Sequence, residues 1–183
     1  AGGWKGSPLE DLIPVSLDLP ERLLAPEVAV MFVMDRSGSM GWRVQGSGRS
    51  QQSIANEAAA AAVKTLEPND LVGVVTFNLS HQVVVPLAPN NDPEATARRI
   101  LDISPDGGTA VAGALQEAAG QLDRVEAKTK HIIVLSDGQS IDADMLPDMA
   151  RAMHQRGITI STIAIGDGAH VQSMQGVAYY GGG

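Results

Sequence analysis

The chain has 183 residues, of which 44% are hydrophobic but only 3% aromatic, and a formal net charge of −8. A chain of this length is expected to form one domain, with a core built from aliphatic side chains, methionine and alanine. The acidic balance argues against a nucleic-acid partner, because phosphate backbones are bound by clustered Lys and Arg, and the absence of cysteine excludes disulfides, zinc–thiolate sites and thiol nucleophiles.

Residues 1–27 are expected to form an extended arm, because prolines recur at positions 8, 14, 20 and 26. No apolar stretch approaches the about 18–20 residues of a membrane span, and the N-terminus lacks the charged-then-apolar pattern of a signal peptide. The chain also lacks an initiator Met and ends in YYGGG. We therefore expect a domain over residues 28–183 that has been cut from a longer protein, and the sequence assigns it no compartment.

Strand and helix patterns alternate along the rest of the chain. Short, continuously apolar runs such as VAVMFVMD and LVGVVTF are typical of strands buried on both faces. The segment NDPEATARRILDI opens with Asp92 as N-cap and Pro93 at the first helical position, which is a strong helix start. We predict strands at 28–35, 71–77, 81–87, 131–137 and 158–166, and helices at 53–67, 91–103, 109–123, 147–156 and 169–178.

The strand at 81–87 differs from the others, because only three residues separate it from the strand before it. Such a link permits a hairpin but no helical crossover, so this strand should be antiparallel and lie at the edge of the sheet. The other strands alternate with helices, which implies a parallel sheet covered on both faces. The sequence therefore predicts an α/β, doubly wound, Rossmann-like sheet, mostly parallel, with one short antiparallel edge strand.

In such a sheet, ligands bind beyond the carboxyl ends of the strands, where the strand order reverses. Polar residues collect at those predicted ends, in the segments DRSGS (35–39), PDGGTA (105–110) and SDG (136–138). Oxygen-only donors of this kind suit a hard divalent cation such as Mg²⁺, Mn²⁺ or Ca²⁺. The candidate metal ligands are Asp35, Ser37, Ser39, Thr109 and Asp137.

The spacing within the first segment supports this interpretation. Asp35, Ser37 and Ser39 alternate, so a curved loop that leaves the strand can point all three side chains inward. Thr109 also has an ordinary alternative role, because threonine before a helix is a common N-cap. Trp42 follows the same loop, and we expect it to close the local core; the alternative is an exposed anchor for a partner.

The apolar strand followed by D-x-S-x-S, the later Gly-Gly-Thr and the strand ending in Ser-Asp-Gly together resemble a von Willebrand factor type A domain, over roughly residues 28–180. That family carries a metal-ion-dependent adhesion site. The resemblance implies that Ser37 and Ser39 bind one cation directly, with Mg²⁺ expected before Mn²⁺ or Ca²⁺. It further implies that Thr109 binds directly or through water, as do Asp35 and Asp137, and that a partner's Asp or Glu fills a remaining position.

The segments LEDLIPVSLDLP, DRSGSM and KHIIVLSDGQS are similar to those of bacterial members found in larger membrane-anchored proteins. The chain departs from the family pattern in two places. Residues 41–52 form a longer, glycine-bearing link than a minimal member needs, and the chain ends where the last strand and helix of the family would begin.

Three functions are compatible with these residues. The leading hypothesis is a metal-dependent protein-binding module that is not an enzyme. The second is a Mg²⁺-dependent phosphoryl-transfer enzyme that uses Asp35, although the position two after it is Ser37 instead of a second carboxylate, and no lysine follows in SDG. The third is a scaffold whose metal site is structural or empty.

Overall fold

The computed structural model describes residues 26–138, 140–166 and 169–183. The expected arm over 1–27 lies outside these residues, apart from Pro26 and Glu27, whose carbonyl oxygens accept hydrogen bonds from the backbone N–H groups of Lys128 and Thr129. Within the described ranges, no helix is long and apolar enough to cross a membrane.

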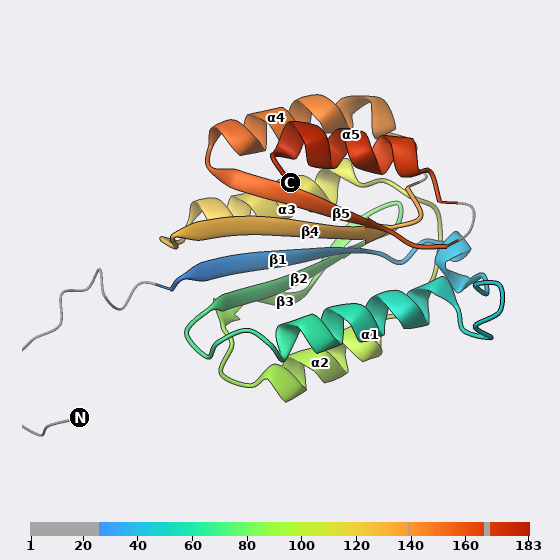
Figure 1. Ribbon diagram of the computed structural model, residues 1–183, viewed down its shortest axis with the longest axis horizontal. Helices are drawn as coiled ribbons and strands as arrows, with labels where there is room; N and C mark the ends of the chain where they lie inside the picture. Colours follow the sequence, from blue (N-terminus) through green and yellow to red (C-terminus); the bar gives the residue numbers. More distant parts are fainter. Residues whose placement is uncertain (1–25, 139, 167–168) are drawn as a thin grey trace, which may run out of the picture.

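The molecule is built on a five-stranded sheet with the order β3-β2-β1-β4-β5 (Figure 1). Strand β1 pairs in parallel with β2 and β4, and β4 pairs in parallel with β5, while β3 is antiparallel to β2 at the edge. This confirms the predicted mostly parallel sheet with one antiparallel edge strand. The strands are β1 (Val28–Asp35), β2 (Leu71–Phe77), β3 (His81–Pro89), β4 (Thr129–Ser136) and β5 (Ile158–Ala164).

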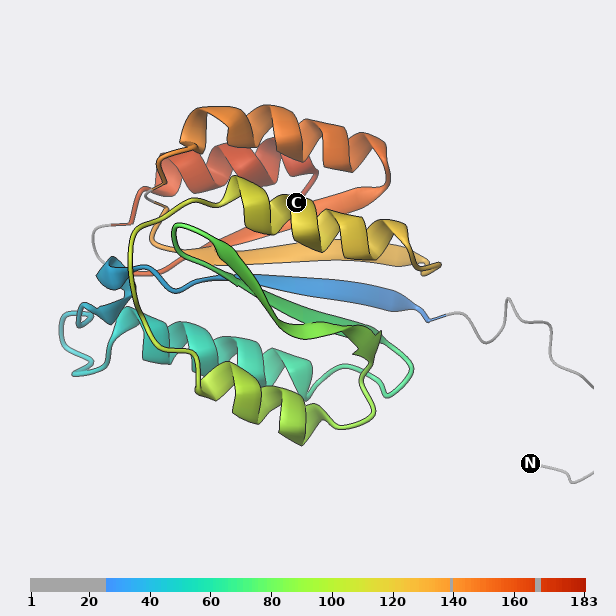
Figure 2. The same cartoon turned by 180° about the vertical axis from the view of Figure 1, so that it is seen from behind.

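Helices cover both faces of the sheet, which confirms the doubly wound prediction. Helices α1 and α2 lie on one face, and α3, α4 and α5 lie on the other (Figures 1 and 2). The strand order reverses between β1 and β4, so the carboxyl ends of these two neighbours form the switch point. The helices are α1 (Gln51–Val63), α2 (Pro93–Leu101), α3 (Ala112–Asp123), α4 (Leu146–Gln155) and α5 (Val171–Gly181).

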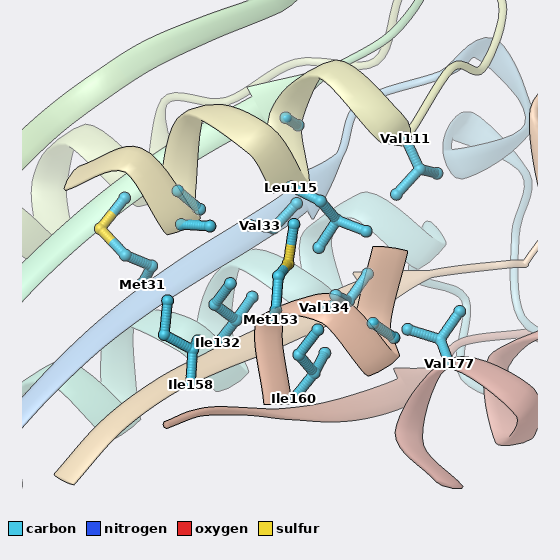
Figure 3. Close-up of a cluster of buried hydrophobic side chains, with 14 of the residues drawn as sticks. Met31, Val33, Val111, Leu115, Ile132, Val134, Met153, Ile158, Ile160 and Val177 are labelled. Carbon is cyan, nitrogen blue, oxygen red and sulfur yellow. The ribbon is translucent and has the colours of Figure 1, made fainter. Parts of the chain in front are cut away.

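The core consists of two apolar layers, one on each side of the sheet, because successive side chains of a strand point to opposite faces. Met31 and Val33 of β1 join the layer under α3, α4 and α5 (Figure 3), whereas Phe32 and Met34 join the layer under α1 and α2. These layers hold the strand ends rigidly, which fixes where the loops at the switch point begin.

Helix α1 ends four residues earlier than predicted. Its last turn tightens, because the N–H groups of Thr65 and Leu66 bond to carbonyls three residues back. The side-chain NH₂ group of Asn90 donates hydrogen bonds to the carbonyls of Val63 and Leu66, at 3.0 and 3.2 Å. A side chain from a distant loop therefore ends this helix before Pro68 is reached.

Candidate metal site

Asp35 ends β1 at the switch point and is fully buried. Its Oδ1 accepts a hydrogen bond from the Ser37 N–H at 2.7 Å, and its Oδ2 accepts one from Ser136 Oγ at 2.5 Å. Burial raises the pKa of Asp35 above its ordinary value of 3.8; the hydrogen bonds from Ser136 and Ser37 oppose that rise, and the negative charge of Asp137 adds to it. No ion pair of the described residues includes Asp35. A cation beside Asp35 would offset both the cost of burying its charge and the repulsion from Asp137.

The loop that follows β1 places two hydroxyl groups side by side. The Oγ atoms of Ser37 and Ser39 lie 3.1 Å apart, with Ser37 buried and Ser39 half-buried. A 3₁₀ turn, η3 (Gly38–Gly41), curves the loop, and the Met40 N–H bonds to the Ser37 carbonyl at 3.0 Å. The Met40 side chain is fully buried in the layer under α1 and α2, so it anchors the loop to the core.

Asp137 lies at the end of β4, next to β1, and is also buried. Its carbonyl accepts a hydrogen bond from the His170 N–H at 2.7 Å. The next residue, Gly138, has φ +82°, and a Cβ there would lie 2.7 Å from the His170 carbonyl oxygen, so only glycine fits. Ser136 Oγ accepts from the Gly138 N–H at 3.0 Å and donates to Asp35, which links the two strand ends. Ser136 was not among the predicted site residues, although it stands in the same SDG motif.

The third loop, residues 105–110, is bonded to the loop after β1. The Gly38 N–H donates to the Gly107 carbonyl at 2.8 Å, and the Asp106 N–H donates to the Arg36 carbonyl at 2.6 Å. Gly107 has φ +79°, a conformation that favours glycine. Asp106 itself is exposed and forms a 3.9 Å ion pair with Arg36.

Thr109 does not cap α3, so the N-cap alternative is wrong. The helix begins three residues later than predicted, at Ala112, and Val111 occupies the N-cap position. The carboxylate of Asp142, from the loop between β4 and α4, binds the first N–H groups of the helix instead. Thr109 is half-buried, and its carbonyl accepts a hydrogen bond from the Ile141 N–H at 3.1 Å.

The structure thus collects the predicted residues on three neighbouring loops. Asp35, Ser37 and Ser39 share one loop, Asp137 is near enough for its charge to act on Asp35, and Thr109 lies on a loop bonded to the first. The described residues contain no group of three or more His, Asp and Glu side chains that could hold a metal. Two carboxylates with three hydroxyls are a sparse, oxygen-only donor set, which fits a hard cation that takes its remaining ligands from water or a partner.

Exposed apolar side chains surround the three loops. Trp42, Leu79 and Ile141 are 65%, 66% and 79% exposed. The prediction that Trp42 closes the local core is wrong, because Met40 fills that position. Leu79 covers Gly108, where a Cβ would lie 2.7 Å from its Cδ2. We call Trp42, Leu79 and Ile141 the apolar rim of the site. A cavity of about 400 Å³ lies beside Ile141. Its lining includes Thr109, Gly138, Ile141 and His170.

The sequence model of one family, described as the von Willebrand factor type A domain, matches residues 30–139. An uncharacterized Synechocystis protein is 28% identical over 153 residues, and the mouse collagen alpha-5(VI) chain is 29% identical over 147. These alignments cover 80% and 75% of this chain but only 34% and 5% of the relatives, so the chain spans a minor part of each.

Solved structures with the same fold come from several kinds of organism. An aerotolerance-related membrane protein of Bacteroides fragilis has a TM-score of 0.75 at 23% identity, over 85% of this chain and 89% of that one. Proximal thread matrix protein 1 of the mussel byssus, solved with a zinc-occupied MIDAS motif, has a TM-score of 0.71 at 20% identity, over 85% and 40%. Manganese-loaded TRAP of Plasmodium vivax has a TM-score of 0.66 at 18% identity, over 84% and 63%.

Proposed function

Because the chain belongs to the von Willebrand factor type A domain family, we propose that it is a metal-dependent protein-binding module. One divalent cation, with Mg²⁺ as the first candidate, lies at the switch point of the sheet. The hydroxyls of Ser37 and Ser39 hold it directly. Asp35, Asp137 and Thr109 hold it directly or through water. An Asp or Glu of a partner protein takes the remaining coordination position.

The observation that carries this proposal is the meeting of two buried carboxylates, on neighbouring strands, with a pair of hydroxyls 3.1 Å apart. A buried carboxylate is costly unless a cation offsets its charge: burial is the main cause that raises the pKa of Asp35, and the negative charge of Asp137 adds to the rise. The zinc-occupied and manganese-loaded relatives support a divalent cation as the group that this fold accommodates.

The donor set also favours an acidic partner. Hydroxyl ligands are neutral, so a bound cation would keep enough positive charge to attract a further anion. The exposed rim of Trp42, Leu79 and Ile141 would exclude water around that contact, and charge pairs are stronger where water is excluded. A partner segment in which apolar residues flank the acidic side chain fits this rim.

The phosphoryl-transfer alternative finds no support in the surroundings of Asp35. Both carboxylate oxygens already accept hydrogen bonds, from Ser37 and Ser136, and the side chain is fully buried. Position 37, two residues after Asp35, holds a serine where such an enzyme needs a second carboxylate, and the segment 136–138 offers no lysine.

The test compares Ser39→Ala with Ser80→Ala, a substitution of an exposed serine in the turn between β2 and β3. Melting temperature is followed as Mg²⁺ is added to protein freed of metal by EDTA, and bound proteins are recovered from an extract of the source cell with Mg²⁺ or EDTA. We expect wild type and Ser80→Ala to be stabilised by Mg²⁺ and to retain a partner only in its presence. Ser39→Ala should melt normally in EDTA but lose both responses. Full partner recovery by Ser39→Ala, or by wild type in EDTA, would contradict the proposal.

A further inference from the structure

Asp142 binds the first turn of α3 although it lies 30 residues further along the chain. Its Oδ1 accepts from the Val111 N–H at 3.1 Å, and its Oδ2 accepts from the Ala112 N–H at 2.8 Å. Ser140 Oγ donates to Oδ1 of the same carboxylate. These first N–H groups have no partner within the helix, and the N-cap residue Val111 has no side-chain acceptor, so Asp142 replaces a local cap.

Further contacts join the same two segments. The Ile141 N–H donates to the Thr109 carbonyl at 3.1 Å, and Ser140 Oγ lies 3.3 Å from the Val111 nitrogen and 3.5 Å from the Thr109 carbonyl oxygen. Residues 140–142 therefore hold residues 109–112 through both side-chain and backbone groups. We call this set of contacts the 140–142 clamp.

The clamp lies between two of the proposed metal ligands. Residue 140 is three positions after Asp137, and the clamped segment begins at Thr109 itself. Two other backbone bonds of the Thr109 loop run to other segments: the Ala110 N–H donates to the Asn78 carbonyl after β2, and the Gly38 N–H, in the loop after β1, donates to the Gly107 carbonyl. The clamp thus supplies the connection from Thr109 toward the end of β4.

We propose that Asp142 is a positioning residue for the metal site, which acts through the 140–142 clamp to fix Thr109 relative to Asp137. Asp142 is not among the proposed ligands; its carboxylate binds the N–H groups of Val111 and Ala112 and the hydroxyl of Ser140. The inference rests on the proposed function, since it concerns the geometry of the same metal site. Residues that orient metal ligands in this way are typically worth about 10–100-fold in metal affinity.

Helix α2 offers a matched control. Asp92 caps α2 through Oδ1, which accepts from the Ala95 N–H at 2.8 Å, so its removal also costs a helix cap. Asp92 lies just after β3, whose end pairs with the start of β2, and therefore at the edge of the sheet opposite the metal site. The variants Asp142→Ala and Asp92→Ala share the loss of a cap and differ in proximity to the site.

The experiment measures the dissociation constant of Mg²⁺ for wild type and both variants by titration calorimetry. We expect Asp142→Ala to bind Mg²⁺ about 10–100-fold more weakly than wild type, and Asp92→Ala to bind it as wild type does. Wild-type affinity in Asp142→Ala would overturn the inference, and so would equal weakening in both variants. A wild-type protein that binds no Mg²⁺ would instead refute the proposed function, so the two failures are distinguishable.

A second variant covers the case in which Asp142→Ala does not fold. Asp142→Asn keeps the shape of the side chain, but its NH₂ group cannot accept from the second backbone N–H. In EDTA, hydrogen exchange at Val111 and Ala112 should accelerate, while exchange at Ala95 stays unchanged, and Mg²⁺ affinity should fall. Faster exchange at Val111 and Ala112 with unaltered Mg²⁺ affinity would show that Asp142 is only a helix cap and would overturn the inference.

Discussion

Two buried aspartates, at opposite edges of the same sheet, are surrounded by different donors. Asp70 lies at the amino edge, where Oδ1 accepts from the Val28 N–H at 3.1 Å and Oδ2 from the Glu67 N–H at 3.0 Å. Asp35 lies at the carboxyl edge, where one backbone N–H and one hydroxyl donate to it and a second carboxylate is close. Backbone donors are fixed, whereas hydroxyls rotate and can present a lone pair to a cation. The first arrangement stabilises a fold, and the second is suited to binding an ion.

The largest effect is expected at the amino edge. Asp70→Ala would leave two backbone N–H groups without an acceptor and should lower the free energy of unfolding by about 3 kcal/mol. Urea denaturation in EDTA measures this loss. Mg²⁺ affinity should match that of wild type in the folded variant. A large fall in affinity would contradict a purely structural role for Asp70.

At the carboxyl edge we expect the reverse: Mg²⁺ affinity falls, while stability in EDTA does not. Asp35→Asn removes a buried charge that the fold tolerates poorly, so its stability in EDTA should equal or exceed that of wild type. Mg²⁺ affinity should fall at least about 100-fold, which corresponds to about 2.7 kcal/mol. Calorimetric titration and denaturation of the same preparation provide both values. A strongly destabilised variant with intact Mg²⁺ binding would assign Asp35 to the structural class of Asp70.

The wild-type protein should respond to the ion itself. Mg²⁺ at about ten times its dissociation constant should stabilise the domain by about 1.4 kcal/mol, or about 4 °C in melting temperature. Scanning calorimetry in EDTA and in Mg²⁺ tests this. Identical melting in both would favour the scaffold with an empty site.

A smaller effect is expected in the pH dependence of stability. Burial acts to raise the pKa of Asp142, but hydrogen bonds from Ser140 and from the backbone of Ala112 and Val111 bring it below the ordinary 3.8. A lowered pKa in the folded state adds stability above the unfolded pKa, and this stability is lost as pH falls through the folded value. The stability difference between wild type and Asp142→Asn in EDTA should therefore shrink below pH 3.8. A difference that stays constant with pH would contradict the assigned hydrogen bonds.

The smallest change in stability is expected on the rim. Trp42→Ala should alter the free energy of unfolding by no more than about 0.5 kcal/mol, because the side chain is 65% exposed. Mg²⁺ affinity should remain that of wild type, while recovery of a partner from extract should fall. Undiminished recovery would remove Trp42 from the proposed binding surface.

The sequence predicted best what depends on local patterns. The bounds of β1 and β2 match the prediction, because each is a short apolar run bordered by charged or polar residues. The cap of α2 by Asp92 was also predicted, since that contact spans three residues. The meeting of three loops followed from a general rule about parallel sheets and the order of the motifs.

Long-range contacts account for what was missed. The sequence left a capping role open for Thr109, because Asp142, which binds the first N–H groups of α3, lies far along the chain. The bond between Ser136 and Asp35 spans 101 residues, so the SDG motif contained the serine but did not indicate its partner. Trp42 was expected to close the local core, but the turn at 38–41 places Met40 there instead, so that Met40 is fully buried and Trp42 is 65% exposed.

The reversal of strand order between β1 and β4 also has a consequence for folding. Strands β1, β2 and β3 all lie in the first half of the chain, whereas Asp137 follows β4 and reaches the site only when β4 lies beside β1. The proposed ion site is therefore complete only when β4 lies beside β1, because β1 without β4 would present one carboxylate and too few ligands. Binding of the ion would in that case stabilise the completed domain, because it would link the ends of β1 and β4, which lie far apart along the polypeptide.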